Sequence, residues 1–187
     1  MYNGIFNRFY KHTTRGLEHE LAAYRYRVFV EKLGWELDTP VGYERDQFDK
    51  PDTIYVVARN EKKEIVGCSR LLPTSEPYLL SEVFPQLLNG NPPPHSPFIW
   101  EISRFSALDL NAPSLEKQKG SLSSTVAAGL LKASVDYLAR YNITTIVTVS
   151  PLAVERLIRG LGYKVHRGGA PVKVDGQPVI ACIIDLT

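Results

Sequence analysis

The sequence predicts a single α/β domain that spans residues 1–187 and is built on a mixed β-sheet. Helical and strand-like patterns alternate along the chain, which is typical of this fold class. Phe98–Ala107 and Thr144–Val149 are apolar runs of strand length, and the long amphipathic stretch Lys119–Tyr141 separates them. A chain of 187 residues is also long enough to bury a substantial core.

The first predicted element is an amphipathic helix over Gly16–Leu33. Its apolar residues recur every three or four positions from Leu17 to Val28, and Gly34 marks its end. Residues 34–51 then lack periodicity and form a long irregular loop. Loops of this length are usually functional or disordered, so we interpret this one as a substrate-covering loop.

A β-hairpin and a short helix follow the loop. Thr53–Arg59 and Glu64–Leu72 are strand-like and are joined by a polar turn. Ser81 is expected to cap a short helix that runs through Leu88. Asn89–Pro97 is rich in proline and is expected to be irregular.

The last third of the chain predicts a helix and a pair of strands. Pro151–Leu161 is expected to be helical, because proline is tolerated in a first turn, and Gly162 ends the helix. Tyr163–His166 and Pro178–Ile184 are strand-like, with the hairpin signal Asp175-Gly176 between them.

Composition narrows the possible functions. The net charge of +2 gives no reason to expect nucleic-acid binding. No apolar run has the length of a membrane span, and the N-terminal residues lack a signal-peptide pattern. Cys68 and Cys182 both lie in strand-like apolar segments, which suits buried thiols in a reducing compartment. We therefore expect a cytoplasmic protein that does not bind membranes.

Charge is distributed unevenly. Residues 36–52 are predominantly acidic, whereas residues 153–174 carry five basic side chains and one acid, Glu155. One interpretation is that both stretches are solvated faces. The other is that a cationic substrate binds near the first stretch and an acidic protein partner binds near the second.

Two charged residues stand inside the strand at Phe98–Ala107. Glu101 and Arg104 lie among aromatic and branched aliphatic neighbours. Buried charges are costly unless they are paired or have a function. Glu101 is therefore either a general base or the partner of Arg104 in a buried ion pair.

Three short sequence motifs upstream, which we call words, carry further charged and aromatic residues. RYRVFVEKLGW contains Arg25, Phe29 and Trp35. ERDQFDK contains Asp46 and Asp49, and GCSRLL contains Arg70. Together with Glu101 and Arg104, these words resemble the acyl-homoserine lactone synthase family, the LuxI-type autoinducer synthases. The resemblance is specific because several separated words match in order. It implies a single-domain three-layer α/β/α sandwich with a mixed, splayed sheet, similar to acetyltransferases of the GNAT type.

The resemblance also implies an activity. Family members join S-adenosylmethionine to an acyl chain from acyl carrier protein, giving N-acyl-homoserine lactone, methylthioadenosine and holo carrier protein for quorum sensing. The two partners implied are thus S-adenosylmethionine and acyl carrier protein. No cofactor is implied, because S-adenosylmethionine is a consumed substrate.

The reacting and S-adenosylmethionine-binding residues carry over position by position, whereas the acyl-pocket and docking residues are expected from the apolar or basic character of their segments. Glu101 and Arg104 are implied to be catalytic, and the implied S-adenosylmethionine site consists of Arg25, Phe29, Trp35, Asp46, Asp49 and Arg70. The expected acyl pocket consists of Phe105, Leu122, Val126, Ile146, Thr148, Val149, Ser150 and Leu152. The expected docking surface for the carrier protein consists of Arg156, Arg159, Lys164 and Arg167.

Two alternative functions remain open at this point. One is an N-acetyltransferase that uses acetyl-coenzyme A, because the stretch at residues 117–122 weakly resembles a pyrophosphate-binding loop. The other is a non-catalytic module that binds a carrier protein or senses a lactone. No metal site is expected, because the histidines lack metal-ligand spacing and the cysteines do not form a CxxC motif.

Overall fold

The structure is a computed structural model that describes residues 6–11, 15–111 and 125–186. Its contacts divide the chain into two compact units. The first unit comprises Met1–Ser69 and Arg104–Leu130, and the second comprises Arg70–Ser103 and Leu131–Thr187. Each unit is described below by itself.

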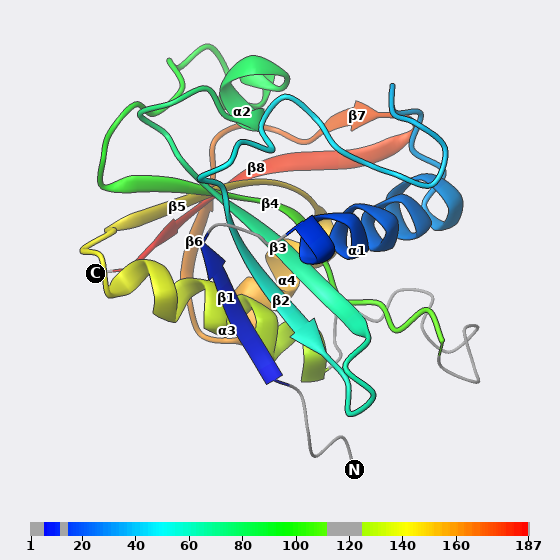
Figure 1. Ribbon diagram of the computed structural model, residues 1–187. Coiled ribbons are helices and arrows are strands. Elements are labelled where there is room, and N and C mark those ends of the chain that lie inside the picture. The colour runs from blue at the N-terminus through cyan, green and yellow to red at the C-terminus, as the bar shows by residue number, and fades with distance from the viewer. Residues whose placement is uncertain (1–5, 12–14, 112–124, 187) are drawn as a thin grey trace. The chain divides into compact units, whose positions relative to one another are not determined.

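Strands of the first unit form an antiparallel arrangement. Strand β1 (Phe6–Lys11) pairs with β2 (Ile54–Arg59), and β3 (Ile65–Pro73) begins in this unit (Figure 1). The turn between β2 and β3 includes Lys63 in the left-handed region, at φ 65°. The predicted hairpin is confirmed, whereas β1 was not predicted.

The predicted N-terminal helix is confirmed in extent but changes geometry midway. An α-helix, α1 (Arg15–Arg25), continues directly into a π-helix over Tyr26–Lys32. The wider turn is evident where the Leu33 N–H donates to the Val28 carbonyl, five residues earlier. Gly34 then ends the segment at φ 70°. Such π-helical stretches are rare and frequently occur at functional sites.

The core of the first unit lies between the helix and the hairpin. The apolar face of α1 and its π-helical continuation packs on side chains of β2 and β3, and the cluster consists of Leu17, Leu21, Tyr24, Val28, Phe29, Tyr55, Val57, Ile65 and Cys68. At roughly 25 cal/mol per Å² of buried apolar surface, such a cluster is a main source of this unit's stability.

Residues 34–53 are irregular, as predicted, but they are fixed to the helix. The Glu44 N–H donates to the Ala22 carbonyl at 3.1 Å, and Phe48 is buried. Thr53 closes the loop, because its hydroxyl donates to the Phe48 carbonyl at 2.9 Å. The loop therefore holds its polar side chains against the end of α1.

The second unit contains a mixed sheet in the order β4-β5-β8-β6, with β7 on β8 (Figure 1). Strands β4 (Ile99–Ser106) and β5 (Thr145–Pro151) are parallel. Strand β8 (Gln177–Asp185) is antiparallel to β5, to β6 (Lys164–Arg167) and to β7 (Val172–Val174). The prediction of a mixed sheet is confirmed.

Pairing between β4 and β5 covers only the first part of both strands. The register runs from Ile99 opposite Thr145 to Glu101 opposite Val147, while both strands continue beyond these residues. This limited pairing agrees with the predicted splayed sheet. Asp175 and Gly176, at φ 48° and 76°, form the predicted hairpin turn between β7 and β8.

The short helix before Asn89 differs from the prediction. Helix α2 (Leu79–Glu82) begins one residue after Tyr78, which is its N-cap, and a 3₁₀ helix (Pro85–Leu88) follows. Ser81 is the third helical residue, so the prediction that it is the cap was wrong. Its hydroxyl instead donates to the Tyr78 carbonyl at 2.9 Å and closes the first turn.

Two longer helices complete the described elements. Helix α3 runs over Thr125–Ala139, so the first part of the predicted helix lies outside the described residues. Helix α4 runs over Leu152–Gly160, with Pro151 as its N-cap and Gly162 at φ 86° just past its end. Pro151 thus precedes the helix instead of occupying its first turn. In the described ranges, no helix is long and apolar enough to cross a membrane.

Candidate active site

Five charged side chains of the first unit form one network, which we call the ion cluster. Arg25 is the last residue of α1, Glu44, Asp46 and Asp49 belong to the irregular loop, and Arg104 lies on β4. The side chains of Arg25, Glu44 and Asp49 are at most 3% exposed. Their burial is possible because each charge has an oppositely charged partner.

Arg25 is enclosed by two carboxylates. Its Nε donates to Glu44, and its Nη1 donates to Asp49 Oδ1 at 2.8 Å. Burial alone would lower the pKa of Arg25, but Asp49 and Glu44 outweigh it and raise the pKa well above its ordinary value. Its Nη2 is buried and has no hydrogen-bond partner among the residues that the structure describes. An unsatisfied buried donor is unusual and marks a position where a ligand acceptor would be stabilised.

Glu44 connects the two arginines and was not predicted as a site residue. One of its oxygens accepts from Arg25, and the other accepts from Arg104 Nε at 3.2 Å. It is 1% exposed although it lies in a loop. The sequence offered one signal, namely that Glu44 stands two residues before Asp46 within the acidic stretch. Nothing in that spacing distinguishes a buried acid from a solvated one.

Arg104 binds carboxylates of the loop. Its Nη2 donates to Asp46 Oδ2 at 2.7 Å and lies 3.1 Å from Glu44 Oε1. In the described part of the chain its ion-pair partners are these two acids, so the predicted alternative of a Glu101–Arg104 ion pair is wrong. Arg104 adopts φ 51° within a strand, a strained conformation that usually occurs at functional sites.

An aromatic pair lies beside the ion cluster. Phe29 and Trp35 stack with their ring centroids 4.7 Å apart. The Arg104 guanidinium carbon lies 5.7 Å and 5.9 Å from the Phe29 and Trp35 ring centroids, respectively. The backbone just after the π-helix brings the two residues together, because the Trp35 N–H donates to the Phe29 carbonyl at 2.9 Å.

Asp46 and Asp49 serve both the cluster and their own loop. Asp46 Oδ1 accepts from the Phe48 N–H at 2.9 Å, and Asp49 Oδ2 accepts from the Asp46 N–H at 2.8 Å. Asp49 Oδ1 also accepts from the Tyr55 hydroxyl. Asp46 and Asp49 therefore stabilise the turn of their own loop and also form ion pairs. The turn fixes the positions of their carboxylates.

Glu101 belongs to the second unit and contacts the start of α2. Its Oε2 accepts from the Leu79 N–H at 3.0 Å, and its Oε1 accepts from the Leu80 N–H at 2.8 Å. Glu101 is fully buried. A helix start leaves N–H groups without intrahelical partners, and Glu101 satisfies two of them. The carboxylate is thus fixed in place with both oxygens engaged.

Arg70 also lies in the second unit and is fully buried. It extends from β3, and its Nε donates to the Ser103 hydroxyl of β4 at 3.0 Å. Its assignment to the S-adenosylmethionine site stays a prediction.

The expected acyl-pocket residues do not all share one surface. Ile146, Thr148 and Ser150 are buried and alternate along β5, so they face one side of the sheet and Val149 faces the other. The Thr148 and Ser150 hydroxyls lie 2.8 Å apart and hydrogen-bond to each other. Phe105, Val126 and Leu152 are half-buried, and Leu122 lies outside the described residues.

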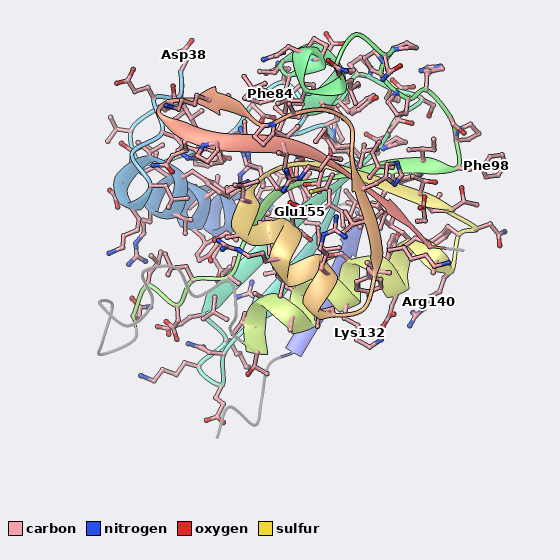
Figure 2. All side chains as sticks on the ribbon, turned by 180° about the vertical axis from the view of Figure 1, so that it is seen from behind. Asp38, Phe84, Phe98, Lys132, Arg140 and Glu155 are labelled. Atoms are coloured by element: carbon pink, nitrogen blue, oxygen red, sulfur yellow. The ribbon has the colours of Figure 1, made fainter. Side chains whose placement is uncertain are left out.

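The expected docking residues divide into two kinds. Arg167 and Arg159 both bind Glu155, with nearest distances of 2.7 Å and 3.0 Å, and Glu155 is 5% exposed. These contacts tie α4, where Figure 2 labels Glu155, to β6. Arg156 and Lys164 are exposed and have no ion-pair partner among the described residues. The charge available to a partner therefore lies mainly at these two positions.

Metal ligands do not cluster in the described ranges, where no group of three or more His, Cys, Asp or Glu residues could hold a metal ion. Cys68 and Cys182 are buried free thiols. The buried ion cluster and the stacked aromatic pair both belong to the first unit.

Comparison with known sequences gives a consistent family. The sequence model of the autoinducer synthase family matches residues 9–187. An acyl-homoserine-lactone synthase of Acinetobacter nosocomialis is 48% identical over 178 residues, which cover 95% of this chain and 97% of that protein.

Comparison with solved structures agrees. TofI, in a ternary complex with an inhibitor and MTA, matches with a TM-score of 0.82 and 42% identity, over 96% of this chain and 90% of TofI. BjaI, a CoA-dependent acyl-homoserine lactone synthase with SAM and isopentyl-CoA, matches with a TM-score of 0.83 and 26% identity, over 98% of this chain and 84% of BjaI.

A Lactobacillus plantarum protein described as an N-acetyltransferase shares the fold alone, with 19% identity over 99% of this chain and all of that protein, and a TM-score of 0.60. Fold and site together define an acyltransferase of the α/β, GNAT-like class. The chain belongs to the autoinducer synthase family, whose members are acyl-homoserine-lactone synthases. The predicted family and enzyme class are thus confirmed, and the non-catalytic alternative is set aside.

Proposed function

We propose that this enzyme joins S-adenosylmethionine to an acyl chain delivered by acyl carrier protein. The products would be N-acyl-homoserine lactone, methylthioadenosine and holo carrier protein, and the lactone would serve quorum sensing. S-adenosylmethionine would bind at Arg25, Phe29, Trp35, Asp46, Asp49 and Arg70, with no cofactor. Both cysteines are buried as free thiols, which suits a cytoplasmic enzyme.

The observation that carries the proposal is the open donor of Arg25 within a carboxylate-rich cluster. Within the described part of the chain Arg25 Nη2 has no hydrogen-bond partner, and the carboxylate of the methionyl group would supply one. The sulfonium is a fixed positive charge, which carboxylates and aromatic faces attract. Asp46 and the stacked Phe29 and Trp35 provide both kinds of group in the same unit.

Two bond exchanges make up the reaction. The methionyl amine attacks the thioester carbonyl, a C–N bond replaces the C–S bond, and the carrier leaves as a thiol with the proton that the amine gives up. The methionyl carboxylate then attacks the methionyl carbon that is bonded to the sulfonium. A C–O bond replaces the C–S bond, and the sulfur leaves in neutral methylthioadenosine. The first step requires an unprotonated amine, whereas α-amino groups have a pKa of roughly 8.

Glu101 is the residue that we assign to removal of the amine proton. It is buried on β4 and its position is fixed by the Leu79 and Leu80 N–H groups. An ionised carboxylate at this position could accept the proton that the amine gives up. Arg104, held by Glu44 and Asp46, would orient the methionyl end.

For the acyl donor we propose acyl carrier protein, which is typically acidic, because Arg156 and Lys164 are exposed basic residues. Acyl-coenzyme A is the second candidate, because the similar enzyme BjaI is CoA-dependent. Ile146, Thr148 and Ser150 offer one buried face of β5 to the acyl chain.

The test is mass spectrometry on extracts of cells that express the protein, scanned for the homoserine-lactone fragment. Detection of an acyl-homoserine lactone supports the proposal and gives the acyl chain. Purified protein is then supplied with S-adenosylmethionine and the same acyl group on carrier protein or on coenzyme A. If only acyl-coenzyme A is used, the donor assignment is wrong. If no lactone forms with either donor, the proposed function is wrong.

A further inference from the structure

Two adjacent glycines of the second unit lie against the segment that holds Glu101. Gly168 and Gly169 directly follow β6, and the Gly168 N–H donates to the Ala181 carbonyl of β8 at 2.9 Å. Neither glycine has a left-handed backbone conformation, so this is not the reason for glycine at these positions. The space around the two residues gives the reason instead.

The space beside Gly169 is filled by backbone. A methyl group on Gly169 would lie 2.7 Å from the carbonyl oxygen of Leu87 and 3.2 Å from the backbone nitrogen of Asn89. Real Cβ atoms essentially never lie within 3.0 Å of such an atom, so the backbone would have to move. Leu87 belongs to the 3₁₀ helix (Pro85–Leu88), and Asn89 is its C-cap at φ 52°. Gly169 therefore permits a close approach of this helix.

The space beside Gly168 is limited mainly by a side chain. A methyl group there would lie 2.8 Å from Leu88 Cδ2, the end of a flexible side chain that can change its rotamer. The next atoms, Ala181 Cβ and the Leu87 carbonyl oxygen, would be 3.3 Å and 3.4 Å away, so they would shift by a few tenths of an ångström at most. A methyl group at Gly169 thus displaces backbone, whereas one at Gly168 displaces a side chain.

The segment that Gly169 contacts also carries the donors that hold Glu101. Helix α2 packs against the 3₁₀ helix, and two residues separate them in the sequence. The Leu79 and Leu80 N–H groups at the start of α2 donate to the two Glu101 oxygens. Leu80 and Leu87 are fully buried, and a close-packed interior transmits displacements. A shift of the 3₁₀ helix should therefore reach the carboxylate.

We propose that Gly169 is a positioning residue for the reaction, because the close approach that it permits places the α2 N–H groups that hold Glu101. This inference rests on the proposed function, in which Glu101 accepts the amine proton. Loss of one donor leaves the other in place, whereas a displaced α2 moves both donors and the carboxylate with them. Misplacement of a catalytic group by about 1 Å can lower a rate by roughly 100-fold.

The test measures the kinetics of lactone formation well below the unfolding temperature of each variant. Gly169→Ala should lower kcat by roughly 10–100-fold and leave the KM for S-adenosylmethionine unchanged. Gly168→Ala is the matched control, because it adds the same methyl group one residue earlier and should keep a near-normal kcat. Gly160→Ala is a second control, since a methyl group there would meet nothing outside its own helix within 4 Å.

The same substitution in a Glu101→Gln background separates positioning from a general loss of stability. If Gly169 acts through Glu101, Gly169→Ala should cause little further loss of kcat once the carboxylate is gone. An equal factor in both backgrounds would show that the two residues act independently, and this would overturn the inference. A wild-type kcat in folded Gly169→Ala would overturn it as well, and neither result would contradict the proposed function.

Asn89→Ala carries the test if Gly169→Ala does not fold. Alanine is disfavoured in the left-handed conformation of Asn89, so the same turn should shift and kcat should fall, again only while Glu101 is present. Asn89→Gly suits this conformation and should keep kcat. Equal kcat values for these two variants would overturn the inference. If Glu101→Gln is as active as the wild type, the inference and the assignment of the base are both wrong. If the wild type forms no lactone, the proposed function is wrong too.

Discussion

Glu101 and Arg104 lie three residues apart on β4 but have different partners. Glu101 accepts hydrogen bonds from backbone N–H groups of α2, and Arg104 binds the loop carboxylates of Glu44 and Asp46. Arg104 itself adopts a left-handed backbone conformation, at φ 51°. The two residues therefore have separate roles, which substitutions can distinguish.

Glu101→Gln is expected to lower both stability and rate. The amide has one acceptor oxygen in place of two, so one buried N–H of α2 loses its partner, at a cost of about 1–3 kcal/mol in the free energy of unfolding. Loss of the general base should reduce turnover by roughly 10²–10⁴-fold. Thermal unfolding and turnover should be measured on one preparation.

Leu79→Pro is the matched control for Glu101→Gln. It removes one N–H that donates to Glu101 but keeps the carboxylate, and proline is tolerated at this first helical position. It should share the loss of stability and retain most of the turnover. If both variants are less stable and equally active, Glu101 is structural and the assignment of a base is wrong.

Arg104→Lys should impair use of S-adenosylmethionine although the charge is kept. An ammonium cannot reproduce the fork that reaches both Glu44 and Asp46. One buried carboxylate then loses a partner, so we expect kcat/KM for S-adenosylmethionine to fall by roughly 10–100-fold. Arg59→Lys, at the surface pair with Glu20, is the control. Near-normal kcat/KM in Arg104→Lys would rule out this positioning role.

The sequence predicted most elements because their periodicity reflects local burial. The helix from Gly16, the hairpin and the apolar strands were recognisable in this way. The π-helix over Tyr26–Lys32 could not be predicted, because the apolar spacing of this stretch equally suits an α-helix. Strand β1 was missed because its pairing with β2 is not encoded in its own short sequence.

Some residues within the recognisable sequence motifs lie together in the structure, whereas a residue defined by its contacts was missed; the functional roles of the whole set stay a prediction. Arg25, Asp46, Asp49 and Arg104 do converge in one cluster. Glu44 was missed because burial of a loop acid depends on which arginines approach it. The docking surface was predicted from the basic composition of residues 153–174. Composition could not reveal that Arg159 and Arg167 form ion pairs with Glu155. The single-domain assignment stays a prediction.

Acid should weaken the attachment of α4 to β6. Hydrogen bonds from Arg167 and then Arg159 hold the pKa of the Glu155 carboxyl below its ordinary value of 4.5. A lowered pKa contributes stability that is present above about pH 4.5 and is lost as the pH falls through the folded-state value. Between pH 5 and pH 3 the melting temperature of the wild type should thus fall further than that of Glu155→Gln. Parallel curves for the two proteins would contradict this account.

Arg156 and Lys164 should carry the electrostatic attraction to acyl carrier protein. Reversal of both to Glu should raise the apparent KM for the carrier protein several-fold and leave that for S-adenosylmethionine unchanged, because rim charges chiefly speed association. The difference should shrink with added salt. Reversal of Lys132 and Arg140, which lie on and just after α3 (Figure 2), is the matched control. An unchanged KM for the carrier protein would mean that this surface is not the docking site.

The most direct test of the central claim is the stoichiometry of turnover. Purified protein is supplied with S-adenosylmethionine and an acyl carrier protein bearing the acyl chain found in cells. Free thiol, methylthioadenosine and acyl-homoserine lactone are then quantified over one time course. The account predicts that all three appear in equal amounts and only when S-adenosylmethionine is present. Thiol release that continues without S-adenosylmethionine, or with a simple amine in its place, would contradict it.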